Sequence, residues 1–324
     1  MTAHLTPESW QYRDLNKRAP SLSVLSDVLI ELAEQGHPVA AGTADLQHSN
    51  GLVGFVERFP ERFVQFGISE QNMVSAAAGI ATTGMIPYVA TFASFLGLLA
   101  CEQIRMDVAY CAQPVRLIGH HTGISMGFYG TSHHATEDIS TMRAIADLTV
   151  ISPSDGVQYA ALLRESATYA QPIYFRTGRG QDPVVYEAGE PFKIGKAKVH
   201  GLGKDVTIIA CGMAVHGAKA AVKALNEKGH SVGLIDMHTI KPLDVEAVQE
   251  AAKYSKIILT VEEHNILGGL GSAVAEVLAE QPSKARLVRH GIMDEFSLIA
   301  PPTHLYRHYK LDAAGIEEIA KLHI

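Results

Sequence analysis

The chain has 324 residues, of which 47% are hydrophobic and 19% are charged, and its 27 Lys and Arg against 34 Asp and Glu give a formal net charge of −7. This balance excludes disorder as the dominant state, because an apolar chain of low charge can bury enough surface to offset its conformational entropy. The basic residues are scattered, which argues against a nucleic-acid backbone or a membrane surface as the partner. We therefore expect about two domains and a small-molecule ligand.

The cysteines and the amino-terminal sequence indicate in which cellular compartment the protein acts. Cys101, Cys111 and Cys211 form no CxxC pair, so we expect neither a disulfide framework nor a zinc knuckle. The polar start MTAHLTPESWQYRD is unlike a secretory signal, and no apolar stretch approaches the roughly 18 to 20 residues that span a bilayer. We expect a cytoplasmic protein.

Short β-branched runs alternate with longer helical segments in the first half of the chain. Strands are predicted over residues 64–68, 86–92, 115–120, 148–153 and 173–177, and helices over 71–83, 96–110 and about 157–167. Ser154 or Asp155 can cap the last of these helices. The pattern is typical of repeated β-α units around a largely parallel sheet.

A second α/β unit follows a looser segment at residues 183–198. Its strands are predicted over 206–211, 232–237, 257–261 and 287–289, and its helices over 215–228, 245–254 and 272–280. We therefore divide the chain into an extension at 1–18, a first domain at 19–182, a linker at 183–198 and a second domain at 199–324.

One acidic residue stands at the junction of a strand and a helix. In FGISEQNM, Glu70 ends an apolar strand and begins a helix of small residues. Taken alone, it is an ordinary first-turn glutamate, stabilised by the helix dipole by about 0.3 to 1 kcal/mol. If the flanking apolar residues bury it, its proton affinity becomes a functional property.

Two aromatic residues follow the next predicted strand. Phe92 and Phe95 in TFASF share a helical face, and rings at this spacing usually belong to the core. Their place at a strand-to-helix turn weakens the core interpretation, because α/β proteins bind ligands at the carboxyl ends of parallel strands.

The segment GHHTGISMGFYGTSHH is rich in histidine and glycine. Neither HExxH nor a His-carboxylate spacing fixed on one helix is present, which argues against a metal site. A loop that presents imidazoles to a polar substrate fits the glycines better. A glycine-rich surface loop with incidental histidines is the alternative.

An arginine pair, Arg176 and Arg179, emerges from a predicted strand in YFRTGRG. A planar guanidinium at a strand end can bind a phosphate, sulfonate or carboxylate through two hydrogen bonds. The alternative is that these are ordinary solvent-exposed arginines, which are common on protein surfaces. Neither a P-loop nor a full nucleotide-binding glycine motif is present.

Taken in order, these motifs resemble a known family. The succession TADLQHSN, FGISEQNM, TFASF, GHHTGISMGFYGTSHH and YFRTGRG resembles the pyrimidine-binding domain of transketolases, and VEEHNILGGLGSAV with GIMDEF resembles their carboxyl-terminal domain. The resemblance covers about residues 19–324 and implies two three-layer α/β domains, the pyrimidine-binding domain first.

The resemblance also implies a partner subunit. Complete transketolases hold magnesium and the diphosphate of thiamin diphosphate in a further domain with a GDG motif, which this sequence lacks. A split transketolase is expected, in which an amino-terminal subunit supplies that domain and binds most of the Mg²⁺. An α2β2 heterotetramer follows, because the cofactor of this family lies between domains of opposing protomers.

For the cofactor, the resemblance implies that Glu70 hydrogen-bonds the aminopyrimidine ring of thiamin diphosphate and favours its imino form. The remaining residues that match the cofactor-binding positions of the family are Asp45, Leu46, Phe92, Phe95 and Leu98. Leu98 stands where many transketolases have tyrosine, which keeps apolar packing and deletes a hydroxyl.

For the substrate, the resemblance implies ketol transfer from a ketose to an aldose, with Glu70, His121 and His133 as the catalytic residues. His121 and His133 match histidines that contact the sugar, Ser49 matches a phosphate-contacting serine, and Arg176 matches the arginine that grips the terminal phosphate. Arg179 is a neighbour of that position and not a match.

Two departures from the family pattern bear on the sugar. The aspartate that reads a substrate hydroxyl falls on Tyr129, and the segment at 19–23, APSLS, has no arginine for the phosphate clamp. Loss of one charge-assisted contact is worth on the order of 1.5 to 3 kcal/mol. We hypothesise a variant substrate such as a branched, shortened or sulfonated sugar.

Three other functions stay open at this point. The β subunit of a 2-oxo acid dehydrogenase E1 shares the two-domain layout, cofactor and obligate partner, but the histidine loop suits a polyhydroxylated substrate better. A non-catalytic partner-binding subunit and a nucleotide-dependent oxidoreductase are the remaining alternatives, and a Glu70→Ala variant and an NAD titration would test them.

Overall fold

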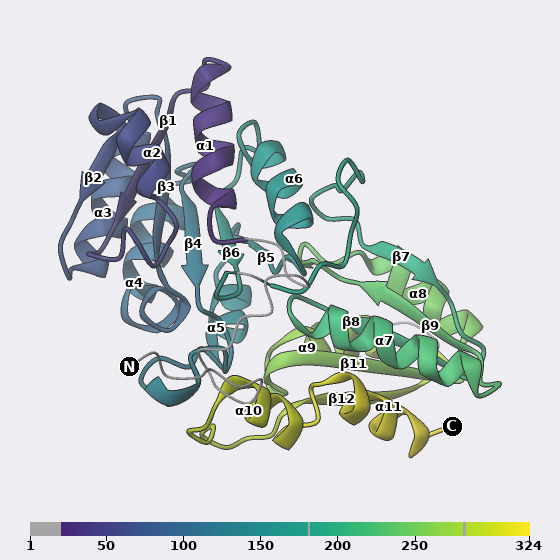
Figure 1. Cartoon of the computed structure of the whole chain (residues 1–324). Coiled ribbons are helices and arrows are strands. Elements are labelled where there is room, and N and C mark those ends of the chain that lie inside the picture. The colour runs from purple at the N-terminus through teal and green to yellow at the C-terminus, as the bar shows by residue number, and fades with distance from the viewer. Residues whose placement is uncertain (1–20, 181, 281–282) are drawn as a thin grey trace.

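The chain forms two mainly parallel sheets that lie side by side, with the purple-to-teal first half on the left of Figure 1 and the green-to-yellow second half on the right. This computed structural model describes residues 21–180, 182–280 and 283–324. The predicted extension at 1–18 and the first two residues of the APSLS segment lie outside the described residues.

The first sheet has the strand order β10-β5-β6-β4-β3-β1-β2, and every pairing is parallel except that of β10 with β5. In the same order, these strands are β10 (Thr239–Lys241), β5 (Thr149–Ile151), β6 (Ile173–Arg176), β4 (Arg116–His120), β3 (Ile86–Phe92), β1 (Val39–Thr43) and β2 (Phe63–Gln65). Consecutive parallel strands bring their carboxyl ends, and the loops that follow them, to one edge of the sheet.

Helices cover both faces of this sheet. One face packs against α1 (Val24–Glu34), α2 (Val53–Arg58) and α6 (Gly156–Ser166), and the other against α3 (Glu70–Ala81), η2 (Phe95–Leu99), α4 (Cys101–Gln103), η3 (Ile104–Tyr110) and α5 (Asp138–Ala144). Alternate residues of β3 serve the two layers, since Tyr88 packs with the first set of helices and Val89 with the second.

The second sheet has the order β12-β11-β8-β9-β7, with only the edge strand β7 antiparallel. Its strands are β12 (Arg286–Ile292), β11 (Ile257–Asn265), β8 (Val206–Ala210), β9 (Val232–Asp236) and β7 (Lys198–Gly201). Helices α7 (Ala214–Glu227), α10 (Pro302–His308) and α11 (Ala313–Lys321) pack on one face, and α8 (Val245–Tyr254) and α9 (Leu270–Glu280) on the other.

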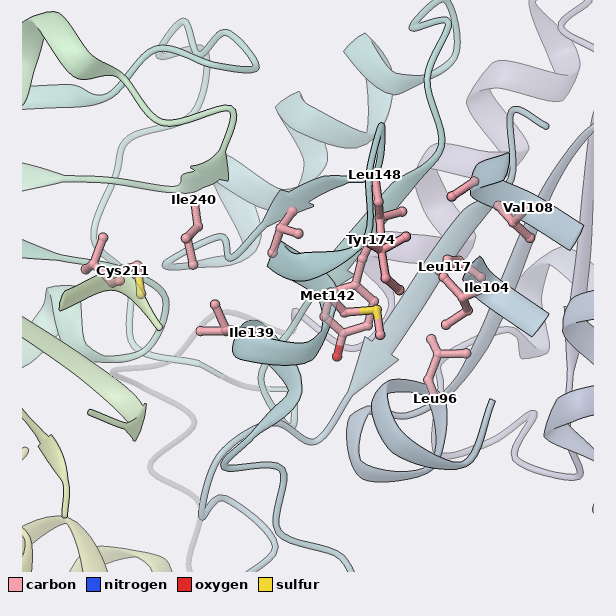
Figure 2. Close-up of a cluster of buried hydrophobic side chains, with 14 of the residues drawn as sticks. Leu96, Ile104, Val108, Leu117, Ile139, Met142, Leu148, Tyr174, Cys211 and Ile240 are labelled. Carbon is pink, nitrogen blue, oxygen red and sulfur yellow. The ribbon is translucent and has the colours of Figure 1, made fainter. Parts of the chain in front are cut away.

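One hydrophobic cluster crosses from the first sheet to the second. Figure 2 shows Ile139 of α5 with Met142 and Tyr174 on one side and with Cys211 and Ile240 of the second half on the other. In addition, β10 belongs to the second half of the chain but is a strand of the first sheet, where it pairs with β5. The two halves therefore share a core, which fixes how elements of the second half approach the edge of the first sheet.

The predicted elements agree well with the structure. The strand at 86–92 and the helix at 245–254 match within their predicted bounds, and the predicted cap is Asp155, whose carboxylate accepts the Gln158 N–H. The segment at 96–110 is not one α-helix but two π-helical stretches around a short α turn. The three cysteines are free. The fold class, two α/β units with mainly parallel sheets, is confirmed.

Among the helices of the described residues, none combines the length and the apolar character that crossing a membrane requires.

Candidate functional site

The predicted aromatic and histidine residues meet beside the carboxyl ends of β3 and β4. The Phe92 ring lies 5.7 Å from Phe95 and 4.5 Å from His121, measured between centroids. The His133 ring lies 5.2 Å from Phe95 and 5.0 Å from Tyr129. We call these five side chains the ring cluster. The sequence motifs that contain them are separated along the chain, and the parallel sheet brings them together.

The histidine loop, residues 121–135, reaches this cluster through an unusual backbone. Gly123, Gly127 and Gly130 have φ values of 56°, 57° and 71°, and His121, which is not glycine, has φ 59°. A left-handed conformation costs a residue with a Cβ roughly 1–2 kcal/mol. A bridge between Gly123 and Ala135 closes the loop on itself. The loop therefore holds His121 in a conformation that the chain would not adopt unaided.

His121 is a neutral, partly unsatisfied imidazole. Burial lowers its pKa to about 2, and the neighbouring His120, Arg179 and His133 add to the effect. The side chain is 7% exposed, and within the described part of the chain nothing hydrogen-bonds its Nδ1. A buried polar atom without a partner costs about 1–3 kcal/mol, so this nitrogen is suited to a ligand.

Of the other histidines in and next to the loop, one lies in the ring cluster and two lie in the protein interior. His133 belongs to the ring cluster, and partial burial lowers its pKa. His120 turns away from the loop, since its Nδ1 lies 3.1 Å from Thr177 Oγ1, and burial lowers its pKa to about 4. His134 pairs with Ser297 Oγ at 2.5 Å. The doubled histidines therefore each contribute one ring to the cluster and one to the interior.

Glu70 begins α3 and is 5% exposed. Its Oε1 accepts a hydrogen bond from the Thr91 hydroxyl at 3.4 Å, a long distance for such a bond. Thr91 directly precedes Phe92, so the carboxylate lies at the strand end that carries the ring cluster. Glu70 is therefore buried, as the second of the two sequence interpretations requires.

The remaining predicted cofactor residues come from two segments nearby. Asp45, Leu46 and Ser49 lie in the loop after β1, the strand next to β3, and the Asp45 N–H donates to Gln65 Oε1. Leu98 lies in η2, three residues after Phe95, and is 51% exposed. The sheet therefore brings these residues to the same edge as the ring cluster.

Arg176 has a different environment from the one expected of an anion-gripping arginine. It is 2% exposed, and its Nε donates to Asp138 Oδ2 at 2.9 Å. Its Nη2 donates to the backbone oxygens of Ala135 and Glu263. Burial alone would lower its pKa, but the charges of Asp138 and Glu263 raise the pKa above its usual value. In the structure this guanidinium is hydrogen-bonded within the protein interior, and its expected role in binding a phosphate stays a prediction.

Arg179 lies three residues further along, past the end of β6, and is only partly buried. Its charge contributes to the lowered pKa of His121, so this residue lies near the ring cluster. Of the two arginines in YFRTGRG, the second is therefore the better placed to meet a ligand that reaches the ring cluster.

The structure adds residues that the sequence analysis did not select. Thr91 contacts Glu70, and Glu263 of β11 contacts the histidine loop by accepting the Ile124 N–H at 2.8 Å. The signal for Glu263 was present in the sequence, because ILTVEEHN places two acids inside an apolar strand. An acid in such a position needs specific partners when buried.

Within residues 21–180, 182–280 and 283–324, no three His, Cys, Asp or Glu side chains are placed to share a metal ion. His121 and His133 of the loop instead lie against aromatic rings. The donors at the site, one carboxylate and two imidazoles beside phenyl rings, are suited to a planar heterocycle and a hydroxylated substrate.

Comparison with known proteins matches both halves to one family. Residues 21–183 match the family described as transketolase, pyrimidine binding domain, and residues 195–316 match transketolase, C-terminal domain. A solved structure described as "Split gene transketolase, inactive beta4 tetramer" superposes with a TM-score of 0.86 at 36% identity, over 94% of this chain and 97% of that one.

Two curated relatives are similar over nearly their whole length. A subunit of the apulose-4-phosphate transketolase of Phocaeicola vulgatus is 38% identical over 90% of this chain and 93% of its own. A 6-deoxy-6-sulfo-D-fructose transketolase subunit of a Clostridium species is 33% identical over 91% of each.

The fold and the comparisons define an α/β enzyme, and its candidate ligand site lies beside the carboxyl ends of parallel strands. The chain belongs to the transketolase family, a family of transferases, as the resemblance of the motifs indicated.

Proposed function

We propose that this chain is the carboxyl-terminal subunit of a split transketolase, which transfers a two-carbon ketol unit from an anionic ketose to an aldose with thiamin diphosphate. The observation that carries the proposal is a buried carboxylate, Glu70, at the strand end that holds the ring cluster. The family match, and relatives of similar length that are named as subunits, support it.

The residues present fit the pyrimidine half of the cofactor. Glu70 offers a carboxylate whose Oε1 accepts a long hydrogen bond from Thr91, and Phe92 and Phe95 offer ring faces beside it. A planar heterocycle with hydrogen-bonding nitrogens suits this donor set. Asp45, Leu46 and Leu98 would complete the binding site from the flanking segments. When bound, thiamin diphosphate supplies the nucleophilic carbon and the electron sink that this chemistry requires.

Glu70 would hold a shared proton on its carboxylate, facing the pyrimidine ring. The Thr91 hydroxyl orients Oε1. The diphosphate and Mg²⁺ fall to the partner subunit, since the sequence of this chain has no GDG motif.

His121 and His133 would bind the sugar as neutral hydrogen-bonding groups. Their pKa values are lowered, chiefly by burial, so at neutral pH each ring carries one N–H donor and one nitrogen acceptor. Such a pair can orient hydroxyl and carbonyl groups without placing a positive charge in the site. Tyr129, 55% exposed and beside His133, would contact the substrate at the open side of the cluster.

The substrate anion would be bound by Arg179 together with Ser49. We assign this role to Arg179 because it is partly exposed near His121, whereas Arg176 is buried with Asp138 in the interior. A guanidinium binds phosphate and sulfonate equally well in geometry, so the site admits either group. Two relatives are named for such substrates: apulose 4-phosphate has a phosphate group, and 6-deoxy-6-sulfo-D-fructose has a sulfonate group.

We further propose a ketose other than the common pentose phosphates as the donor. Tyr129 replaces an acidic hydroxyl-reading residue by a ring, which changes both hydrogen bonding and volume at that position. The protein would act in the cytoplasm as two copies of each subunit.

The experiment is to co-express the chain with its diphosphate-domain partner and to assay ketol transfer over a panel of donors. The panel contains apulose 4-phosphate, 6-deoxy-6-sulfo-D-fructose and xylulose 5-phosphate, with pyruvate and a branched 2-oxo acid as decarboxylation substrates. We expect ketol transfer with at least one sugar and none from either chain alone. Strong preference for xylulose 5-phosphate would reject the variant-substrate proposal, and turnover of only the 2-oxo acids would replace it by a dehydrogenase E1 subunit.

A further inference from the structure

Glu263 of β11 reaches the histidine loop from the other half of the chain. The side chain is buried, and its Oε1 accepts two hydrogen bonds, from Ile124 N–H at 2.8 Å and from the Tyr306 hydroxyl at 2.6 Å. The loop passes so close that a Cβ built on Gly123 would lie 2.2 Å from Glu263 Cδ. Contact at this distance requires a glycine, so the loop and the carboxylate fit each other specifically.

Arg176 of β6 links the histidine loop to β11 by hydrogen bonds. Arg176 Nη2 donates to the backbone oxygens of Ala135, at the end of the loop, and of Glu263 itself. Ala135 in turn exchanges backbone hydrogen bonds with Gly123. The guanidinium and the carboxylate therefore hold opposite sides of one closed loop, and Asp138 balances the charge of Arg176.

His121 lies two residues before Gly123, with a left-handed backbone that must be maintained by its surroundings. We infer that Glu263 is a positioning residue of the active site, which holds the histidine loop so that His121 faces Phe92 and the substrate. This inference rests on the proposed ketol transfer and extends it, because it gives the carboxyl-terminal half a part in arranging the site.

The ionisation of Glu263 adds a second, independent signature. Burial raises its pKa to about 7, against the opposing effects of Arg176, Tyr306 and the Ile124 N–H. The titratable and charged groups around it are Arg176 of β6, Asp138 of α5 and Tyr306 of α10, with Glu262 and His264 next to it on β11. Among the described residues, its Oε2 has no hydrogen-bond partner, which leaves this oxygen available for the proton.

Protonation therefore removes the charge that strengthens the two hydrogen bonds at Oε1. Because the pKa lies near 7, the positioning effect should be complete above that pH and weaken below it. Wild-type kcat is expected to fall as the pH drops through this range.

Glu262 provides a matched control. It neighbours Glu263 on β11, is equally buried, and burial raises its pKa to about 7 as well. Its carboxylate, however, accepts the N–H groups of Leu270 and Gly271 at the start of α9 and does not contact the histidine loop. A Glu262→Gln variant thus tests for the general effect of removing a buried charge.

The test compares Glu263→Ala, Glu263→Gln and Glu262→Gln by hydrogen exchange of the purified chain and by kinetics of the two-subunit enzyme. In Glu263→Ala, we expect amides of residues 121–130 to exchange about 10-fold faster or more. We expect kcat to fall on the order of 10- to 100-fold while KM changes less. Glu263→Gln should recover part of this kcat and lose the inflection near pH 7, whereas Glu262→Gln should keep both the inflection and the loop protection.

Tyr306→Phe is a milder variant that deletes one hydrogen bond, should Glu263→Ala fold poorly. It is expected to raise exchange in the same loop by a smaller factor. The inference is overturned if loop exchange and kcat of Glu263→Ala stay within twofold of wild type, or if Glu262→Gln reproduces both changes. Exchange needs no substrate, so an absence of ketol transfer in the wild-type enzyme would count against the proposed function and leave the loop result interpretable.

Discussion

At the scale of single residues, environment decides which of two similar side chains can bind a ligand. Arg176 and Arg179 are three positions apart in the sequence, but one is enclosed with Asp138 and the other is partly exposed near His121. His120 and His121 differ in the same way, since one pairs with Thr177 and the other enters the ring cluster. Side-chain direction, which the sequence does not specify in irregular segments, separates scaffold from site.

The arginine pair gives a residue-scale prediction. Arg176→Ala leaves Asp138 as an uncompensated buried charge, so the free energy of unfolding should drop by about 3–5 kcal/mol. Arg179→Ala should raise KM for the anionic ketose about 10-fold or more, since a hydrogen bond to a charged group is worth about 1.5–3 kcal/mol.

Chemical denaturation and steady-state kinetics measure the two effects. Arg176→Lys serves as a control that keeps the charge and loses the planar fork. An Arg179→Ala enzyme with unaltered KM, or an Arg176→Ala enzyme that is stable and has a raised KM, would show that the assignment to Arg179 is mistaken.

At the scale of elements, the sequence predicts the buried strands and fails on segments whose structure depends on tertiary contacts. The strand at 86–92 is a continuous apolar run, as parallel strands buried on both faces require. The three-residue β10 exists because it pairs with β5, and no local pattern predicts that pairing. The ring cluster was predictable from the motifs, whereas the contact of Glu263 with the loop was not, because it joins residues 139 positions apart.

The histidine loop gives an element-scale prediction. Gly123→Ala places a methyl group against the Glu263 carboxyl carbon in addition to the strain of φ 56°. Gly229→Ala is the matched control, since its φ is 87° and nothing lies within 4 Å of the added Cβ. In both variants the left-handed backbone should lower the free energy of unfolding by about 1–2 kcal/mol. At Gly123 we expect overpacking to lower it by a further ~1–3 kcal/mol.

Thermal unfolding and ketol transfer would be measured for both variants. Gly123→Ala should lower Tm more than Gly229→Ala and should also reduce kcat, because the loop carries His121. Equal Tm and equal kcat in the two variants would mean that the loop is free to move away from Glu263.

At the scale of the whole molecule, the two halves are joined in a way that makes the second half part of the site. The hydrophobic cluster in Figure 2 continues from α5 to Cys211 and Ile240. Beside it, Arg176, Asp138 and Glu263 form a buried polar contact from β6, α5 and β11. The ring cluster is therefore built on the first sheet and held in place by the second.

The central claim is that Glu70 serves a cofactor whose diphosphate and Mg²⁺ are held by a partner subunit. The most direct measurement is calorimetric titration of thiamin diphosphate, with Mg²⁺, into the assembled pair of wild type and of Glu70→Ala, followed by the ketol-transfer assay. We expect saturable binding to the wild-type pair, and a loss of kcat on the order of 10²–10⁴-fold in Glu70→Ala with the assembly mass unchanged. No uptake by the wild-type pair, or full turnover without the Glu70 carboxylate, would contradict the account.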